Sequence, residues 1–125
     1  MDDESQVIKL RVPAEAAYAR LARIAGAGIA SRLEFDEDQI AALRLAIDEV
    51  WSILLGTIDH EGAIELTFFS DADGLVVELE VERSDRRRPG RIRTAAAERV
   101  LDRAVDEHWV SPDRRRARLR KRVNA

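Results

Sequence analysis

A change of hydrophobic period in the second half of the chain constrains the fold more than any other feature. The segment AIELTFF, residues 63–69, places apolar side chains at every second position, and the segment LVVELEVE, residues 75–82, does the same. Such alternation is typical of strands with one buried face. The link between them ends in Asp73-Gly74, which favours a tight turn. The sequence therefore predicts an antiparallel hairpin with the inward residues Ile64, Leu66, Phe68, Leu75, Val77, Leu79 and Val81.

The segment before the hairpin has the period of a helix. Asp36 and Gln39 form the pattern of a capping box, and the helix is expected to run from there to Gly56. Its core stripe is predicted to contain Ile40, Leu43, Ile47, Val50 and Leu54.

Weaker patterns flank these two elements. Residues 6–12, QVIKLRV, predict a first strand, and Pro13 is expected at the first position of a helix that Gly26 and Gly28 weaken. The apolar face of that helix is predicted to contain Ala17, Leu21 and Ile24.

The C-terminal part of the chain predicts one more helix and one more strand. After the arginine-rich loop RSDRRRPG, a third helix is expected from about Ile92 to Trp109, with its apolar face built from Ala96, Val100, Ala104 and Val105. Ser111-Pro112 ends this helix. The tail ARLRKRV, residues 117–123, alternates and predicts a last strand, assigned to a sheet edge.

This order of elements predicts the α+β class: a two-layer α/β sandwich with a mixed, mostly antiparallel sheet and helices on one face. At 125 residues we expect one domain, residues 1–125. No apolar run approaches the roughly 18 residues that span a bilayer, and the N-terminus lacks the pattern of a signal peptide. With no cysteine, thiolate chemistry is excluded, and we expect a cytoplasmic protein without membrane contact.

The charge of the chain is strongly asymmetric. Residues 1–82 hold 6 Lys or Arg against 18 Asp or Glu, whereas residues 83–125 hold 15 against 6. One explanation, which we favour, is that the basic part folds back onto the acidic part of the same domain. The other is a charged face for a partner.

Two adjacent carboxylates interrupt the apolar helix, Asp48 and Glu49. At 100° per residue, Asp48 falls on the solvent side near Arg44, and we expect these two to pair. Glu49 lies at the edge of the core stripe, because its neighbours one turn away are Leu45, Ala46 and Ile53. Such a glutamate either reaches water from the rim, is covered by a partner, or is desolvated enough to act as a general base.

The ordered segments of the N-terminal two thirds resemble a known family. VPAEAAYARLARIAG, residues 12–26, precedes LRLAIDEVWSILLG, residues 43–56, and the hairpin ends in GLVVELEVE, residues 74–82. Together they resemble the RsbW-type anti-sigma factors and serine kinases, which have the Bergerat fold of histidine-kinase-like ATPases. The resemblance runs from about residue 6 to residue 82, and it implies a Bergerat-type sandwich here.

The resemblance also implies which site residues are kept. Glu49 matches the family's general base, but Ile53 stands where an asparagine ligates magnesium, and its side chain offers no oxygen to a hard cation. Asp85 is the nearest equivalent of the adenine-reading aspartate, with Arg87 and Pro89 at the glycine positions that follow. We therefore interpret the chain as a degenerate member, with a vestigial base, no metal site and no cofactor beyond weak ATP binding.

In RsbW-type proteins, the function that can outlive the kinase is protein binding. The resemblance implies a protein that sequesters a sigma factor, meets a competing STAS-type anti-sigma antagonist and forms a homodimer. An acidic surface suits a sigma factor, whose promoter-reading surface is basic. The expected partner-binding residues are Glu34, Glu37, Asp38 and Trp51, with Trp51 assigned as an exposed anchor instead of a residue at the core rim.

Two other functions stay open. A nucleic-acid-binding module would use the arginines of residues 86–93 and 114–122, although no aromatic residue interleaves with them for base stacking. An active serine kinase would phosphorylate a STAS antagonist through a rearranged site. The two histidines show no metal-ligand spacing: His60 is expected in a loop, and His108 as a cation at the end of the third helix.

Overall fold

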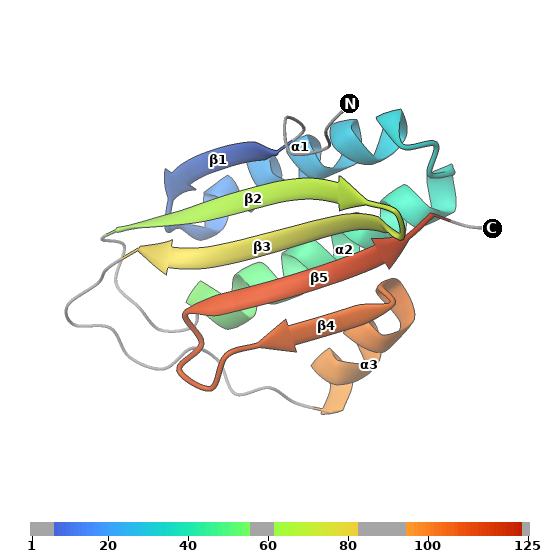
Figure 1. The fold of residues 1–125 in the computed structure, drawn as a ribbon. Coiled ribbons are helices and arrows are strands. Elements are labelled where there is room, and N and C mark those ends of the chain that lie inside the picture. Colours follow the sequence, from blue (N-terminus) through green and yellow to red (C-terminus); the bar gives the residue numbers. More distant parts are fainter. Residues whose placement is uncertain (1–6, 56–61, 83–94, 124–125) are drawn as a thin grey trace.

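The computed structural model describes residues 7–55, 62–82 and 95–123 (Figure 1). The elements in chain order are β1 (Ile8–Pro13), the short 3-10 helix η2 (Ala16–Tyr18), α1 (Ala19–Arg32), α2 (Glu37–Leu55), β2 (Ala63–Asp71), β3 (Gly74–Glu82), α3 (Ala95–Ala104), β4 (Glu107–Val110) and β5 (Arg116–Arg122). The strands form one sheet in the order β1-β2-β3-β5-β4.

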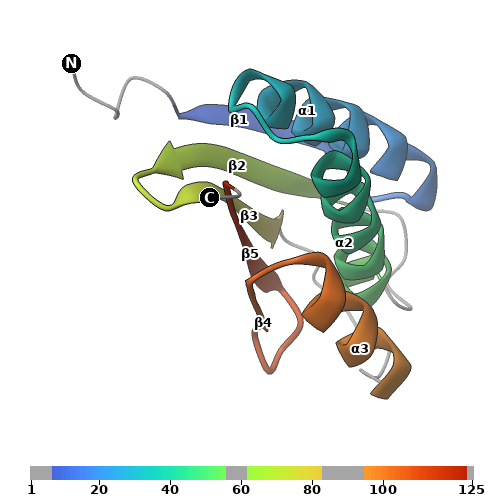
Figure 2. The same ribbon diagram turned by 90° about the vertical axis from the view of Figure 1, so that its right-hand side faces the viewer.

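The protein has two layers. All four strand pairings are antiparallel, so the expectation of a partly mixed sheet is corrected for the described strands. Viewed along the layers, the three helices cover one face of the sheet and leave the other open (Figure 2). The α+β two-layer sandwich predicted from the order of elements is therefore confirmed. Within the described part of the chain, no helix has the length and apolar character needed to cross a membrane.

The hairpin predicted from the alternating segments is confirmed. Strands β2 and β3 pair from Ala63 opposite Glu82 to Asp71 opposite Gly74, and the predicted inward residues are buried. The Asp71 carboxylate accepts hydrogen bonds from the backbone N–H groups of Asp73 and Gly74, which closes the turn. Gly74 has a φ of 146°, a conformation that residues with a Cβ rarely adopt.

Helix α2 begins and packs as its sequence predicts. The backbone N–H of Asp36 donates to Gln39 Oε1 at 3.0 Å, and the Gln39 N–H donates to Asp36 Oδ1 at 2.8 Å, which together make the capping box. The stripe from Leu43 to Leu54 is buried against the sheet, with Ile40 half-buried at its start.

Helix α1 differs from prediction in its start and in its buried face. Pro13 ends β1, and the helix begins only at Ala19 and continues through both glycines. The predicted apolar face points outward, with Leu21 45% and Ile24 58% exposed. The residues that pack inward are small ones: Ala19, Ala22, Gly26 and Ala30. Small residues allow close helix packing, since a Cβ on Gly26 would lie 2.8 Å from Ile47 Cδ1.

The C-terminal elements correct three further predictions. The apolar face of α3 differs from the predicted one, because Ala97, Leu101 and Ala104 are buried whereas Ala96 is exposed. Helix α3 ends at Ala104, and the residues expected to extend it to Trp109 instead form strand β4. Strand β5 is not an edge strand, because it pairs with both β3 and β4. Residues 107–110 form a strand instead of continuing the helix because they pair with the backbone of β5. The Asp106 N–H donates to the Arg120 carbonyl at 2.9 Å, and β4 then pairs with β5 in register.

Candidate functional site

The carboxylate pair of α2 lies in a groove between the start of α1 and the outer side of α2. The groove has a volume of about 290 Å³. Its lining residues are Ala16, Ala19, Arg23, Leu45, Asp48, Glu49, Trp51, Ser52 and Leu55. Glu49 is half-buried there, as its position at the edge of the core stripe predicts.

Asp48 does not pair with Arg44, so that prediction is wrong. Its Oδ1 accepts a hydrogen bond from Arg23 Nη1 of α1 at 2.5 Å, across the contact between the two helices. The local helical spacing placed Asp48 on the outer side but could not show that a second helix brings Arg23 beside it. The ion pair therefore links α1 to α2 at the mouth of the groove.

Ile53 is completely buried in the hydrophobic core. It lies one helical turn beyond Glu49 and packs as a core residue. Its side chain offers no oxygen atom, so it cannot contribute a ligand to a magnesium ion beside Glu49.

Trp51 is a core residue, and its assignment as an exposed anchor is wrong. The side chain is 2% exposed, and its Nε1 donates a hydrogen bond to the Glu15 carbonyl at 3.1 Å. The reason is that the connection from β1 into α1 covers this part of α2. Helical spacing placed Trp51 beside Arg44, which is exposed, but it could not predict this cover.

The three acidic residues predicted to bind a partner gather at the corner between α1 and α2. Glu34, Glu37 and Asp38 are all exposed. We call this set the acidic corner. Among the described residues, none of the three forms an ion pair. The acidic side chains at the start of α2 also suit the positive end of the helix dipole.

Two caps hold the acidic corner in a fixed shape. At the end of α1, the Glu34 N–H donates to the Ser31 carbonyl and the Phe35 N–H donates to the Ala30 carbonyl, which is a Schellman motif. Glu34 takes its left-handed position, with a φ of 67°. Phe35 is buried, and the capping box of α2 follows at once. The corner is therefore an exposed, negatively charged surface whose backbone is hydrogen-bonded at both helix ends.

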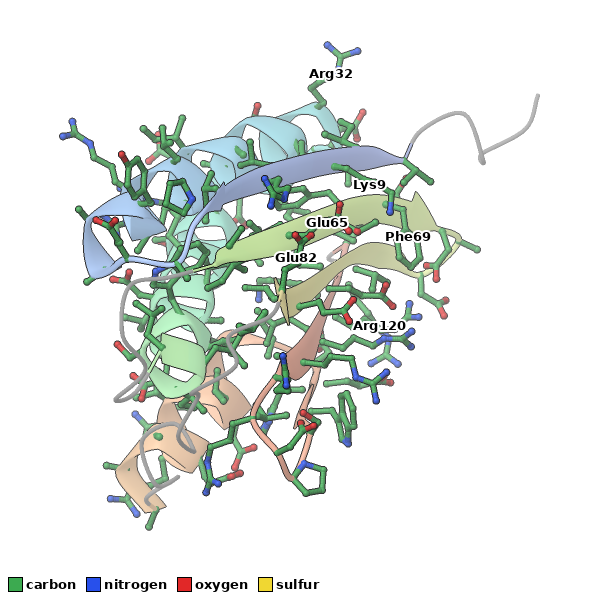
Figure 3. All side chains as sticks on the ribbon, turned by 90° about the vertical axis from the view of Figure 1, so that its left-hand side faces the viewer. Lys9, Arg32, Glu65, Phe69, Glu82 and Arg120 are labelled. Carbon is green, nitrogen blue, oxygen red and sulfur yellow. The ribbon has the colours of Figure 1, made fainter. Side chains whose placement is uncertain are left out.

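The C-terminal arginines lie among carboxylates on the open face of the sheet. Arg118 Nη2 lies 2.5 Å from Glu78 Oε2, and Arg120 Nη1 lies 3.0 Å from Asp71 Oδ2. Figure 3 shows Arg120 on this side of the sheet, together with Lys9 and Glu65. These contacts are what the fold-back explanation of the charge asymmetry predicts. They also occupy arginines that a nucleic-acid interface would need.

Asp71 is the carboxylate whose titration these contacts change. Burial raises its pKa, but the hydrogen bonds from the Asp73 N–H and from Arg120, with the charge of Arg120, outweigh burial. The pKa of Asp71 is therefore held below its ordinary value of 3.8. The hydrogen bond to Asp71 likewise raises the pKa of Arg120.

The sequence analysis missed a second hollow, on the open face of the sheet. It has a volume of about 480 Å³. Its lining residues are Lys9, Glu65, Thr67, Glu78, Leu79, Glu80, Trp109, Arg116, Ala117 and Arg118. Trp109 is 48% exposed, and the Arg116 guanidinium carbon lies 5.9 Å from its ring centroid. An alternating interpretation of residues 107–110 would have placed Trp109 on this face.

Several predicted site residues lie outside the described part of the chain, and one lies in a different element from the predicted one. Asp85 and His60 lie outside the described residues, as do the arginines of residues 86–93. His108 is not at the end of α3: it lies in β4, and its Nε2 is 2.7 Å from Asp102 Oδ1. The prediction of a helix-end cation is therefore wrong.

No protein-family model matches the chain, and no curated protein matches it. The fold defines the class of the domain, an α+β sandwich with five antiparallel strands and helices on one face of the sheet.

Proposed function

We propose that this protein is a degenerate RsbW-type anti-sigma factor with the Bergerat fold. In this proposal it sequesters a sigma factor by protein–protein binding and does not transfer phosphate. In support of the proposal, residues 8–82 form a strand, two helices and a hairpin in the order on which the resemblance to this family rests.

The observation that carries the proposal is the environment of Ile53. This residue is fully buried one turn beyond the half-buried Glu49, so a magnesium ion beside Glu49 would lack the ligand that the family uses. Phosphoryl transfer depends on positioning and on neutralising charge with metal ions. Protein binding needs neither, which favours a binding role for a fold of this type.

The acidic corner is the surface we propose for the sigma factor. Its three side chains are exposed and held by two helix caps, so a partner would meet a surface that is already ordered. Complementary charge favours encounter with a basic surface, such as the one with which a sigma factor meets promoter DNA. The same proposal includes a STAS-type antagonist as competitor, a homodimer and a cytoplasmic location.

The experiment that tests this function is direct binding of the purified chain to purified sigma factors of the source organism. Changing Glu34, Glu37 and Asp38 to lysine should weaken binding by at least about tenfold, because it replaces attraction with repulsion. The control changes Glu80, an exposed acidic residue of β3 that makes no ion pair among the described residues, to lysine and should bind nearly as the wild type does. Equal affinity of the acidic-corner variant and the wild type would contradict the proposed surface.

The same samples distinguish the other functions. Binding should be unchanged when Mg²⁺ and ATP are added, and a requirement for ATP would contradict a degenerate site. Phosphate transfer from labelled ATP to a serine of a STAS protein, lost in Glu49→Ala, would establish the kinase instead. Tight DNA or RNA binding that falls steeply with salt would establish the nucleic-acid-binding module.

A further inference from the structure

Three side chains of metal-binding type converge where α3 meets the edge of the sheet. Glu98 and Asp102 lie one turn apart on α3, and His108 comes from β4. One potential ligand atom from each residue lies within 4.8 Å of the other two. The sequence showed no such spacing, because the histidine comes from a strand that it did not predict.

The fold brings these residues together through a very short connection. Only Val105 and Asp106 separate α3 from β4, and the Asp106 N–H is fixed by the Arg120 carbonyl of β5. Strand β4 therefore runs back beside the helix that precedes it (Figure 1). Alternation along β4 turns His108 to the same side as the buried Val110, toward the helices.

His108 is the residue that distinguishes this group from an ordinary acidic cluster on a surface. Its side chain is 13% exposed, and Nε2 meets Asp102 Oδ1 at 2.7 Å. The other ring nitrogen, Nδ1, is buried and has no hydrogen-bond partner. The geometry that bears on metal binding is therefore that of Nε2, which lies on a mostly buried side chain and faces a carboxylate. If Nε2 bound a metal, the neutral ring would carry its proton on Nδ1.

We propose that Glu98, Asp102 and His108 bind a divalent transition-metal ion, with Zn²⁺ the best fit. An imidazole nitrogen with two carboxylates suits zinc, whereas magnesium and calcium prefer oxygen ligands alone. Ligand atoms about 2.0–2.2 Å from a tetrahedral zinc ion lie roughly 3.3–3.6 Å from one another. The Asp102–His108 contact of 2.7 Å would therefore open to admit the ion, and the Glu98 ligand atom lies within 4.8 Å of both. Three protein ligands leave a fourth position for water. The site does not depend on the proposed anti-sigma function.

A bound ion would join α3 to the edge strand of the sheet. Asp102 and His108 already make one contact between these elements, and the ion would replace the shared proton with two bonds and add Glu98. Since the ligands come together only in the folded chain, Zn²⁺ should bind the native state and raise its melting temperature.

Isothermal titration of the metal-free full chain with ZnCl₂ tests the proposal. We expect one Zn²⁺ ion per chain with a dissociation constant well below about 1 mM, and no comparable heat when MgCl₂ is added instead. His108→Gln should weaken binding by more than the roughly 10- to 100-fold that loss of an outer-shell partner costs. Glu98→Gln and Asp102→Asn should also weaken it. His60→Gln, which removes the other histidine of the chain, is the matched control and should bind Zn²⁺ as the wild type does.

Two further measurements keep the result interpretable. Far-UV circular dichroism without metal should show that His108→Gln folds as the wild type does. Titration with Co²⁺ should give visible absorption bands in the wild type and in His60→Gln, but not in His108→Gln. Absence of binding up to about 1 mM Zn²⁺, or equal affinity in a folded His108→Gln variant, would overturn the site and leave a plain hydrogen bond between α3 and β4.

Discussion

Replacing either of the two tryptophans of this chain by phenylalanine should have a very different effect on the free energy of unfolding. Trp51 is 2% exposed and donates a hydrogen bond to the Glu15 carbonyl, whereas Trp109 is 48% exposed on the open face of the sheet. Replacing Trp51 by Phe removes that donor and leaves a carbonyl unpaired, which costs about 1 kcal/mol. The smaller ring gives up roughly another 1 kcal/mol of apolar burial and packing. We expect Trp51→Phe to lower the free energy of unfolding by about 2 kcal/mol in total.

Urea unfolding followed by far-UV circular dichroism measures this change, because that signal does not depend on tryptophan fluorescence. For a chain of this length, about 2 kcal/mol corresponds to a fall of roughly 8 °C in the melting temperature. Trp109→Phe is the matched control and should stay within about 0.5 kcal/mol of the wild type. If both variants lost the same small amount, Trp51 would not be a core residue and the described packing of β1, η2 and α2 would be refuted.

Two other predictions concern the β2–β3 turn. Gly74→Ala should destabilise the protein by more than about 2 kcal/mol, since its φ is 146° and the new Cβ would lie 2.3 Å from a backbone carbonyl oxygen of β5. Gly28→Ala is the comparison variant: a Cβ there meets nothing within 4 Å, so the change should stabilise α1 by up to about 1 kcal/mol. Urea unfolding of both variants checks that the two changes in stability have opposite signs. Because the pKa of Asp71 is lowered in the folded state, the ionised carboxylate stabilises the fold at pH values above its unfolded pKa of 3.8. This contribution to the free energy of unfolding is lost as the pH falls through the lowered value. Asp71→Asn should therefore lose less stability than the wild type on acidification below about pH 4, and an identical pH profile would contradict the role of Arg120.

The parts of the fold predicted correctly are those where local pattern and long-range packing agree. The β2–β3 hairpin has one apolar face and a turn closed by the Asp71 carboxylate with Gly74 at a positive φ, and α2 has a distinct stripe with a capping box. Helix α1 has no such contrast, because alanine and other apolar residues occupy most of its faces. Its buried face is selected by size, since Gly26 lies against Ile47 where a larger residue would clash. Small residues at 22, 26 and 30 were the signal in the sequence.

The site residues were harder to predict than the helices and strands because their surroundings come from distant parts of the chain. The partner of Asp48 is 25 residues away on α1, and the cover over Trp51 comes from Glu15 at the end of the β1 connection. Residues 107–110 have no decisive local pattern, and β4 forms because the exposed edge of β5 offers backbone partners. A single-helix projection contains none of this information. It does predict correctly that Glu49 is only partly buried.

The opposite charges of the two parts of the chain meet where β5 lies beside β3. In the register of these strands Glu78 faces Arg118, and Arg120 reaches Asp71 at the end of the hairpin. Each such pair on a surface contributes little to stability by itself. Together, however, they neutralise the basic strand within the domain and reduce its attraction for phosphate. The acidic corner has no corresponding basic strand among the described residues, so its charge remains available to a basic partner. This difference in local charge is the reason that the proposed function assigns a basic partner protein to the acidic corner.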